Sequence, residues 1–339
     1  MSWYQGSGEK RDVVVSTRIR LARNLDKIPF PSRMSKEESD KVLNEVASAV
    51  LDRQTGFTLY KMEDLSDMEK RALLEEHLIS AELLDPTVTR GVLLNEDRTV
   101  SIMINEEDHV RLQVILPGFQ PEEAWKIADG MDTLLGETLT FAFHEKMGYL
   151  AACPTNVGTG MRASAMIHLP ALTLTGSLGN LLNSAGKLGM TIRGLYGEGT
   201  EAQGNFYQIS NQRTLGMTEE ELLTKFSSVI RQLMEKEEAV RSRIAESGDA
   251  AVRDRVCRAY GILQNAYVLS GKEFMNLYSD VRLGQSMGFL PAAKEDQDAL
   301  LVNTQIASLC KKEGKLIPAN ERDVKRARVV RERLKGVNE

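Results

Sequence analysis

The chain has 339 residues, of which 42% are hydrophobic and 27% are charged, and its formal net charge at pH 7 is −5. This composition is typical of a soluble globular protein and excludes collagen-like and low-complexity chains. The length predicts roughly two domains, each large enough to bury a core of its own.

The opening residues, MSWYQGSGEKRD, contain no apolar segment of the kind found in signal peptides. No run approaches the ~20 apolar residues of a membrane-spanning helix. Three cysteines, Cys153, Cys257 and Cys310, lie far apart in a pattern that predicts neither disulfides nor a zinc site. We expect Cys257 and Cys310 to be small core residues of helices. Together these features favour a reducing cytoplasm.

From the start of the chain to about residue 218, short β-rich segments alternate with helices. Ser35 and Glu38 form a capping box for a helix over 35–53, and Pro121 begins a helix over 121–147. The short polar turns NEDR and NEEDH favour antiparallel pairing of the segments around them. We expect strands over 12–22, 91–95, 99–105, 110–116, 148–154, 164–170, 190–195 and 205–211.

Beyond residue 218 the pattern is helical and contains no convincing strand. Thr218 and Glu221 form a second capping box. The sequence therefore predicts an α+β domain followed by an all-α domain. Amphipathic periodicity predicts helices over 218–247, 250–269, 271–283, 294–313 and 321–335.

The end of the chain is basic, since Lys311–Lys335 contains ten Lys or Arg and four Asp or Glu. Such a segment could bind nucleic acid, an acidic partner or phosphate, or it could be a solvated helix face. Aromatic residues are absent after Phe289, so no stacking platform accompanies the charge. We therefore expect no direct binding of nucleic acid.

Arginines recur at the predicted strands. Arg18 and Arg20 are two residues apart and therefore project from one strand face, while Arg111, Arg162 and Arg193 each lie next to a glycine or a polar turn. One such arginine alone is usually a surface or salt-bridge residue, and burying a pair is costly unless anions neutralise it. Together, these arginines predict a clamp for a polyphosphate.

Two polar segments accompany this clamp. Asn105–His109, NEEDH, is either a hairpin turn or a source of carboxylates that act as general base or hold a cation. Arg193–Gly204, RGLYGEGTEAQG, is either a loop that closes over a ligand or a plain surface loop. The chain lacks GxxxxGK[ST], HExxH and CxxC motifs, which excludes the commonest cofactor scaffolds.

Four segments in this order, STRIRLARN, NEEDHVR, CPTNVGTGMRA and RGLYGEGTEAQGNFYQISNQRTLG, resemble the catalytic domain of the phosphagen kinases, the ATP:guanidino phosphotransferases. Within that family they resemble the bacterial protein-arginine kinases more closely. The resemblance covers about residues 13–240, and RDVKRA near the C-terminus extends it over nearly the whole chain. It implies a glutamine-synthetase-like, mainly antiparallel sheet with helices over 13–240, followed by a helical domain over 241–339.

The resemblance also implies roles for individual residues. Glu107 corresponds to the carboxylate that engages the substrate guanidinium and Cys153 to the family's reactive cysteine, and Glu106 is a further candidate catalytic residue. The implied ATP-binding residues are Ser16, Thr17, Arg18, Ile19, Arg20, His77, Arg111, Arg162, Ala163, Ser164, Ala165, Met166, Arg193, Gly194, Leu195, Tyr196, Gly197 and Glu198.

The C-terminal motif RDVKRA corresponds, by the same resemblance, to a phosphoarginine-binding pocket separate from the active site. Phosphoarginine carries an anionic phosphate and a cationic guanidinium, which arginine forks and a carboxylate can recognise together. Binding there implies allosteric feedback by the product. The implied residues are Arg322, Asp323, Arg326 and Ala327.

The expected chemistry follows from the charge of the acceptor. A guanidinium is protonated and delocalised, so its nitrogens are poor nucleophiles. Glu107 can orient it as a bidentate acceptor and take a proton as attack proceeds. We expect a Cys153 thiolate to pair with the cation rather than to act as a covalent nucleophile. We also expect Gly158 and Gly160 to let the backbone approach the phosphates, and Mg²⁺ to bridge those phosphates.

The implied function is transfer of the ATP γ-phosphoryl group to arginine side chains of protein substrates, by a cytoplasmic homodimer. Phosphagen kinases of small guanidines carry a helical domain before the catalytic one. Few residues precede STRIR here, so we expect a more open site.

The family further implies a stress-response role in which a zinc-binding activator assists, a heat-shock repressor is a target, and marked proteins pass to a Clp-type unfoldase and protease. Two alternatives stay open: a phosphagen kinase acting on free arginine, and mainly a regulatory module that binds phosphoarginine or a repressor.

Overall fold

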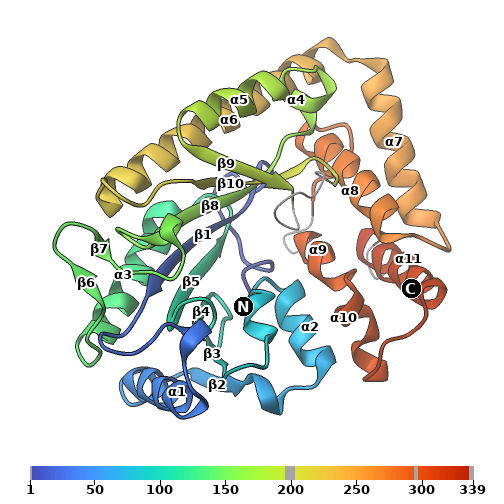
Figure 1. Cartoon of the computed structure of the whole chain (residues 1–339). Coiled ribbons are helices and arrows are strands. Elements are labelled where there is room, and N and C mark those ends of the chain that lie inside the picture. The colour runs from blue at the N-terminus through green and yellow to red at the C-terminus, as the bar shows by residue number, and fades with distance from the viewer. Residues whose placement is uncertain (1, 195–202, 294–296, 336–339) are drawn as a thin grey trace.

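The computed structural model describes residues 2–194, 203–293 and 297–335, and it is built around an eight-stranded antiparallel sheet (Figure 1). The strand order is β2-β3-β4-β5-β1-β8-β10-β9, and β6 and β7 form a separate hairpin. The predicted α+β class with a mainly antiparallel sheet is confirmed. The strands are β1 (Val14–Arg23), β2 (Phe57–Lys61), β3 (Gly91–Asn95), β4 (Val100–Ile104), β5 (Val110–Pro117), β6 (Phe143–His144), β7 (Gly148–Tyr149), β8 (Met161–His168), β9 (Met190–Gly194) and β10 (Phe206–Asn211).

Helices flank the sheet, and those after α6 form the helical C-terminal region that the sequence predicts (Figure 1). Among the described residues, no helix has the length and apolar character needed to cross a membrane. The α-helices are α1 (Lys36–Leu51), α2 (Asp67–Glu75), α3 (Pro121–Gly136), α4 (Pro170–Leu174), α5 (Leu178–Lys187), α6 (Glu219–Ser247), α7 (Ala250–Asn265), α8 (Gly271–Ser286), α9 (Leu300–Asn303), α10 (Ile306–Cys310) and α11 (Ala319–Lys335).

One face of the sheet is buried by α1, α3 and α6. Ile19 of β1, Leu112 of β5 and Ala163 of β8 point to this side and join a single core with Val42 of α1 and Phe226 of α6. The alternation of apolar and polar residues along these strands explains the burial, because successive side chains point to opposite faces.

The other face of the sheet is turned toward the C-terminal helices. Met103 of β4 and Ile115 of β5 belong to a second core that includes Tyr278 of α8, Leu301 of α9 and Val330 of α11. The helical region is therefore packed against the sheet rather than tethered at a distance. The expected domain boundary at residues 240 and 241 falls inside the continuous helix α6, and it stays a prediction.

The predicted helix over 121–147 is too long. α3 ends at Gly136, and the chain then pairs with the residues just after β1, since Asp26 donates a backbone hydrogen bond to Thr140 and Ala142 donates one to Asn24. Residues 143–149 form the β6–β7 hairpin instead. The expected strand over 148–154 is likewise wrong beyond Tyr149, because a 3₁₀ turn follows at Pro154–Asn156.

The predicted helix over 294–313 is also wrong in its described part, where α9 and α10 are separate short helices. Thr304 turns its hydroxyl back onto the Leu300 carbonyl at 2.7 Å, and Gln305 is extended, which breaks the helical run. Cys310 is buried as predicted. Cys257 is exposed, so its expected core position is wrong; it lies on the outer face of α7.

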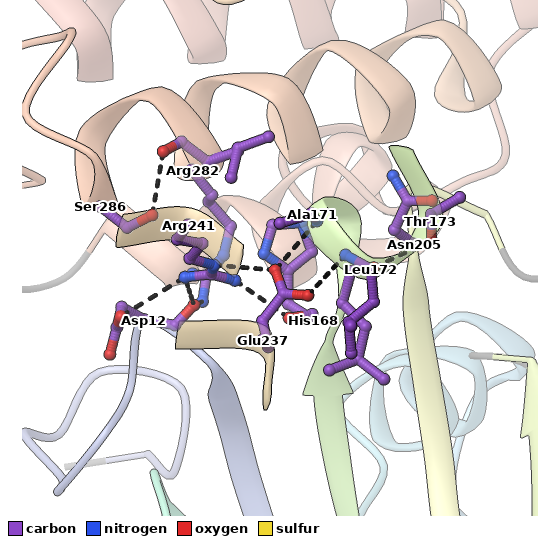
Figure 2. Close-up of polar contacts among 12 residues, drawn as sticks. Asp12, His168, Ala171, Leu172, Thr173, Asn205, Glu237, Arg241, Arg282 and Ser286 are labelled. Carbon is purple, nitrogen blue, oxygen red and sulfur yellow. Dashed lines mark hydrogen bonds and ion pairs between the residues drawn. The ribbon is translucent and has the colours of Figure 1, made fainter. Parts of the chain in front are cut away.

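A buried polar junction joins α6 to the end of β8 and to the N-terminal segment (Figure 2). Glu237 accepts hydrogen bonds from the backbone N–H groups of Ala171 and Leu172 at 3.0 and 2.9 Å, and from Arg241 at 2.8 Å. Arg241 also donates to the His168 carbonyl at 3.1 Å and to Asp12 at 3.4 Å. Both charged side chains are thus paired away from solvent.

The same junction reaches α8. His168 shares a 2.8 Å hydrogen bond with the Ser279 hydroxyl, and the Asn205 side-chain amide donates to that hydroxyl at 3.0 Å. Asn205 precedes β10 directly, and its backbone carbonyl accepts from Leu169 at 3.0 Å. α8 therefore fixes the start of β10 and the end of β8 together.

Candidate active site

The strand register gathers the predicted arginines on one face of the sheet. Arg20 of β1 lies opposite Arg162 of β8, and Arg111 of β5 lies opposite Ala22, two residues along β1 from Arg20. Residues that face each other across antiparallel strands point to the same side. Arg18 and Arg193 have the same orientation, because Arg18 pairs with Ser164, Met166 with Gln208, and Gln208 with Arg193.

Two arginines of this face lack a negatively charged partner among the described residues. Arg18 and Arg20 form no ion pair with the described residues; Arg18 only donates to the Ser164 hydroxyl at 3.4 Å. Burial, together with the cations of Arg111 and Arg162, lowers the pKa of Arg18 to about 10 and lowers that of Arg20 well below its ordinary value. A polyanion bound here would neutralise this repulsion, so the face suits a polyphosphate.

Glu106 supplies a carboxylate to this face. It pairs with Arg111 at 2.5 Å and accepts hydrogen bonds from the Ser80 hydroxyl and the Glu107 backbone N–H. Burial raises the pKa of Glu106, but Arg111 and these donors outweigh burial and hold it below its ordinary value. A carboxylate fixed in this way positions Arg111 and is poorly suited to accept a proton.

Glu107 is the exposed member of the NEEDH run. Its carboxylate accepts no hydrogen bond from the described residues. Burial of part of the side chain, reinforced by the charges of Asp108 and Glu106, raises its pKa. A carboxylate with a raised pKa and open access is suited to bind a cation and to take up a proton.

The remaining members of the run hold the turn together. The Asn105 amide donates to the Ser39 and Thr89 carbonyls, and the buried His109 ring accepts from the Leu25 N–H at 2.9 Å. Asp108 accepts from Asn24 at 2.6 Å and from the Ala152 N–H at 2.7 Å. The hairpin-turn interpretation therefore holds for these three residues, whereas the catalytic role of Glu107 stays a prediction.

The hydrogen bond from Ala152 to Asp108 brings the cysteine segment beside Glu107. Glu107 directly precedes Asp108 in the sequence, and Cys153 directly follows Ala152. Cys153 is half-buried, and its Sγ lies 3.0 Å from the Thr155 hydroxyl. Gly158, with φ +113°, closes the base of this loop. A Cβ there would lie 2.4 Å from the Thr214 carbonyl oxygen, so the glycine permits close packing of backbone on backbone. We had expected Gly158 to let the backbone approach the phosphates, and here it lets the backbone approach Thr214 instead.

His77 lies beside Arg18 at the edge of the arginine face. Burial and the Arg18 charge lower its pKa to about 4, so it is neutral near pH 7. His77 and Met166 line both a small pocket next to Arg18 and a cavity of about 570 Å³ between the sheet, α2 and α9–α10. Trp3 also lines this cavity. Trp3 was not among the residues predicted for the site, although a tryptophan in the polar N-terminal segment could have indicated a buried contact.

Several predicted nucleotide residues point away from the arginine face. Thr17 donates to the Gly118 carbonyl at 2.7 Å, and Ile19, Ala163 and Ala165 are buried in the core under the helices. Their side chains cannot touch a ligand on the arginine face. Ser16, Ser164 and Met166 alternate with them and face the site. Leu195, Tyr196, Gly197 and Glu198 lie outside the described residues, and Gly194 ends β9.

The C-terminal motif is built into the fold. Arg326 is 5% exposed and donates to the Thr304 carbonyl at 3.0 Å, to the Leu269 carbonyl at 2.9 Å and to Asp323 at 2.5 Å. Arg322 donates to the Ile317 carbonyl, and Ala327 is buried in the second core. The motif thus ties α11 to the segment before α8, and its role in binding phosphoarginine stays a prediction. No three His, Cys, Asp or Glu side chains gather as metal ligands in the described ranges.

Comparison with known proteins gives one family. Residues 38–240 match the model of the ATP:guanido phosphotransferase C-terminal catalytic domain, and residues 249–339 match that of the protein-arginine kinase McsB C-terminal domain. The chain is 48% identical over 335 residues to the protein-arginine kinase of Halothermothrix orenii, covering 98% of this chain and 96% of that protein. It is 43% identical over 338 residues to the protein-arginine kinase of Bacillus subtilis, covering 98% and 93%.

Solved structures show the same fold. A lombricine kinase superposes with a TM-score of 0.62 at 24% identity, over 72% of this chain and 70% of that one. The substrate-free duplicated taurocyamine kinase of Schistosoma mansoni superposes with a TM-score of 0.61 at 26% identity, over 78% of this chain and 42% of that one. The chain therefore belongs to the ATP:guanido phosphotransferase family and, within it, to the protein-arginine kinases.

Proposed function

We propose that the enzyme transfers the γ-phosphoryl group of ATP to a guanidinium nitrogen of arginine residues in protein substrates. The observation that carries this proposal is the arginine face, on which Arg18 and Arg20 form no ion pair with the described residues, together with the exposed carboxylate of Glu107. One suits a polyphosphate, and the other suits a guanidinium. Phosphoryl transfer depends mainly on holding two such groups in line and on neutralising their charge.

In this proposal the triphosphate lies along the arginine face. Arg18, Arg20, Arg111, Arg162 and Arg193 donate to its oxygens, with Arg111 held in place by Glu106. The adenosine extends past His77 into the adjoining cavity. Mg²⁺ arrives with the nucleotide and neutralises charge on the phosphates, because phosphate oxygens are ligands that this hard cation prefers.

Glu107 receives the substrate guanidinium and aligns one nitrogen with the γ-phosphorus. As that nitrogen forms its bond to phosphorus, one of its protons passes to Glu107 and the bond to the ADP oxygen breaks. The raised pKa of Glu107 favours this uptake of a proton. Cys153, on the loop beside Glu107, is a second partner for the acceptor cation.

The exposure of Glu107 favours a protein acceptor over free arginine. A small guanidine would need further protein groups to surround it. An arginine on a polypeptide is instead held partly by contacts of its own backbone with the surface around Glu107. The alternative, a kinase of free arginine, predicts comparable turnover of both acceptors. A purely regulatory module would not need the raised pKa of Glu107.

The remaining roles rest on the family resemblance. We propose a cytoplasmic homodimer whose products are recognised by a Clp-type unfoldase and protease, with a zinc-binding activator and a heat-shock repressor among its partners in the stress response. We also propose that phosphoarginine binds at Arg322, Asp323 and Arg326. Arg326 donates to Leu269 in the segment before α8, and Ser279 of α8 contacts His168 and Asn205 at the ends of β8 and β10, which supports a link between that site and the sheet.

The proposal is tested by offering the enzyme Mg-ATP with an unfolded protein and, separately, with free arginine. Phosphorylated residue types are then identified by mass spectrometry under conditions that preserve the acid-labile P–N bond. We expect phosphoarginine on the protein and little on the free amino acid. Phosphorylation of Ser or Thr alone, or equal turnover of both acceptors, would contradict the proposal.

A further inference from the structure

A groove of about 400 Å³ lies at the β6–β7 hairpin, and we call it the hairpin groove. Three apolar side chains on it are unusually exposed: Phe143 by 60%, Leu215 by 54% and Met147 by 43%. The hairpin lies at the edge of the molecule away from the C-terminal helices (Figure 1). Residues that line the groove and enter the argument are Phe143, Met147, Tyr149, Leu215, Glu219 and Glu221.

The floor of the hairpin groove is fixed before anything binds. The guanidinium carbon of Arg23 lies 3.5 Å from the centre of the Tyr149 ring, and Arg23 itself pairs with Asp132 at 2.8 Å. Phe141 and Phe143 both meet Tyr149 edge-on, at centroid distances of 6.2 and 5.3 Å. An aromatic surface that is already ordered loses little conformational entropy when a partner covers it.

The hairpin groove is continuous with the loop that carries Cys153. Tyr149 and Gly158 exchange backbone hydrogen bonds of 2.8 and 3.2 Å that close the base of that loop. Thr214, which precedes Leu215, donates its hydroxyl to the Thr155 and Val157 carbonyls at 2.9 and 2.7 Å. A substrate polypeptide bound in the hairpin groove therefore lies next to the proposed acceptor site.

The charge of the hairpin groove complements a basic partner. Glu219 and Glu221 lie in the first turn of α6, and neither forms an ion pair with a residue of the described ranges. Lys146 is the one basic side chain of the lining. Apolar surface with an acidic edge suits a segment in which apolar residues flank an arginine.

We propose that the hairpin groove binds the apolar residues that flank the acceptor arginine in an unfolded polypeptide. This inference rests on the proposed function and specifies its substrate class. Folded proteins rarely expose contiguous apolar surface, whereas an unfolded chain presents such residues next to arginine. The groove therefore selects for unfolded segments, and the methionine allows it to accept varied side chains.

The test compares two acceptors, an unfolded protein and the capped tripeptide Gly-Arg-Gly, which is too short to occupy the groove. We expect the double variant Phe143→Ser, Leu215→Ser to lose about tenfold in kcat/KM for the unfolded protein, equivalent to about 1.4 kcal/mol. Its kcat/KM for the tripeptide and its KM for ATP should not change. Leu51→Ser, which removes a side chain 41% exposed at the end of α1, is the matched control.

A second measurement tests binding of the polypeptide without turnover. Fluorescence anisotropy of a labelled unfolded polypeptide, in a Glu107→Gln background, should show weaker binding when Phe143 and Leu215 are replaced. Equal losses on both acceptors, unchanged binding of the polypeptide, or a change of oligomeric state that accounts for the loss would each overturn the proposal. If the unaltered enzyme phosphorylates neither acceptor on arginine, the proposed function itself fails.

Discussion

Glu106 and Glu107 are adjacent carboxylates with opposite surroundings. Glu106 is buried against Arg111, which holds its pKa low, whereas Glu107 is exposed and has a raised pKa. One side chain can therefore stabilise the phosphate clamp while its neighbour handles the acceptor. The turn at Asn105–His109 separates the two roles, because it buries Glu106 and leaves Glu107 exposed.

The raised pKa of Glu107 predicts the acid limb of the pH–rate profile. The proposed base works as the carboxylate, so kcat/KM for the acceptor should fall as pH decreases through its raised pKa. A Glu107→Gln variant should lose this limb along with most of its activity. A profile of the unaltered enzyme that stays flat down to pH 4 would argue against Glu107 as the base.

The same shift has a consequence for stability. Because the folded-state pKa lies above the unfolded-state value, ionising Glu107 costs folding free energy as pH rises through this range. Glu107→Gln should therefore unfold at a higher temperature than the unaltered enzyme at pH 7. Below the unfolded pKa, where both states are protonated, the two should have the same Tm.

At this scale the sequence indicated the arginines well, because a spacing of two along a strand fixes a common face. The family resemblance, however, assigned whole segments to the nucleotide site without regard to the strand face. Ile19 and Ala163 were included with the nucleotide site and lie under the helices instead. Trp3 and Gln208 were missed, since they reach the site only through the tertiary fold.

At the level of elements, the β6–β7 hairpin and the loop after it organise the acceptor side of the site. The sequence pattern predicted a helix through residue 147, because local apolar spacing cannot reveal that Asp26 and Ala142 bond to partners across the chain. β2 was missed for a related reason. It is an edge strand with a half-exposed pattern, so it lacks the apolar run that marks a buried strand.

Gly158 offers a test of this loop. Gly158→Ala should lower the free energy of unfolding by about 2 kcal/mol or more, because φ is +113° and the new Cβ meets the Thr214 carbonyl. Gly130→Ala in α3 is the control, with no atom within 4 Å of its Cβ, and it should stabilise by about 0.5–1 kcal/mol. Urea titration of both variants measures the difference; equal effects would show that the loop tolerates rearrangement.

For the molecule as a whole, the helical region and the sheet share a core and a buried polar junction. Helix periodicity predicted α6, α7, α8 and α11, since each repeats apolar residues over several turns. The junction of Glu237 and Arg241 was beyond sequence reasoning. Within an amphipathic helix, a Glu and an Arg four residues apart predict a surface pair, and here they are buried.

That burial predicts a large effect of breaking the pair. Arg241→Met should lower the free energy of unfolding by about 3–5 kcal/mol, because it leaves Glu237 charged and buried. Arg231→Met on the same helix breaks an exposed pair with Glu122 and should cost under about 1 kcal/mol. Guanidinium denaturation followed by circular dichroism checks both. A small effect at Arg241 would mean that the junction relaxes or admits water.

The central claim is that Glu107 serves the acceptor while the arginine face holds the nucleotide. The most direct measurement is the yield of phosphoarginine on an unfolded protein, mapped by mass spectrometry, for the unaltered enzyme and Glu107→Gln at saturating Mg-ATP. The account predicts a loss of at least about 10²-fold in the variant. Its affinity for ATP, measured by calorimetry, should not change. A variant that forms phosphoarginine at the unaltered rate, or that loses ATP binding instead, would contradict it.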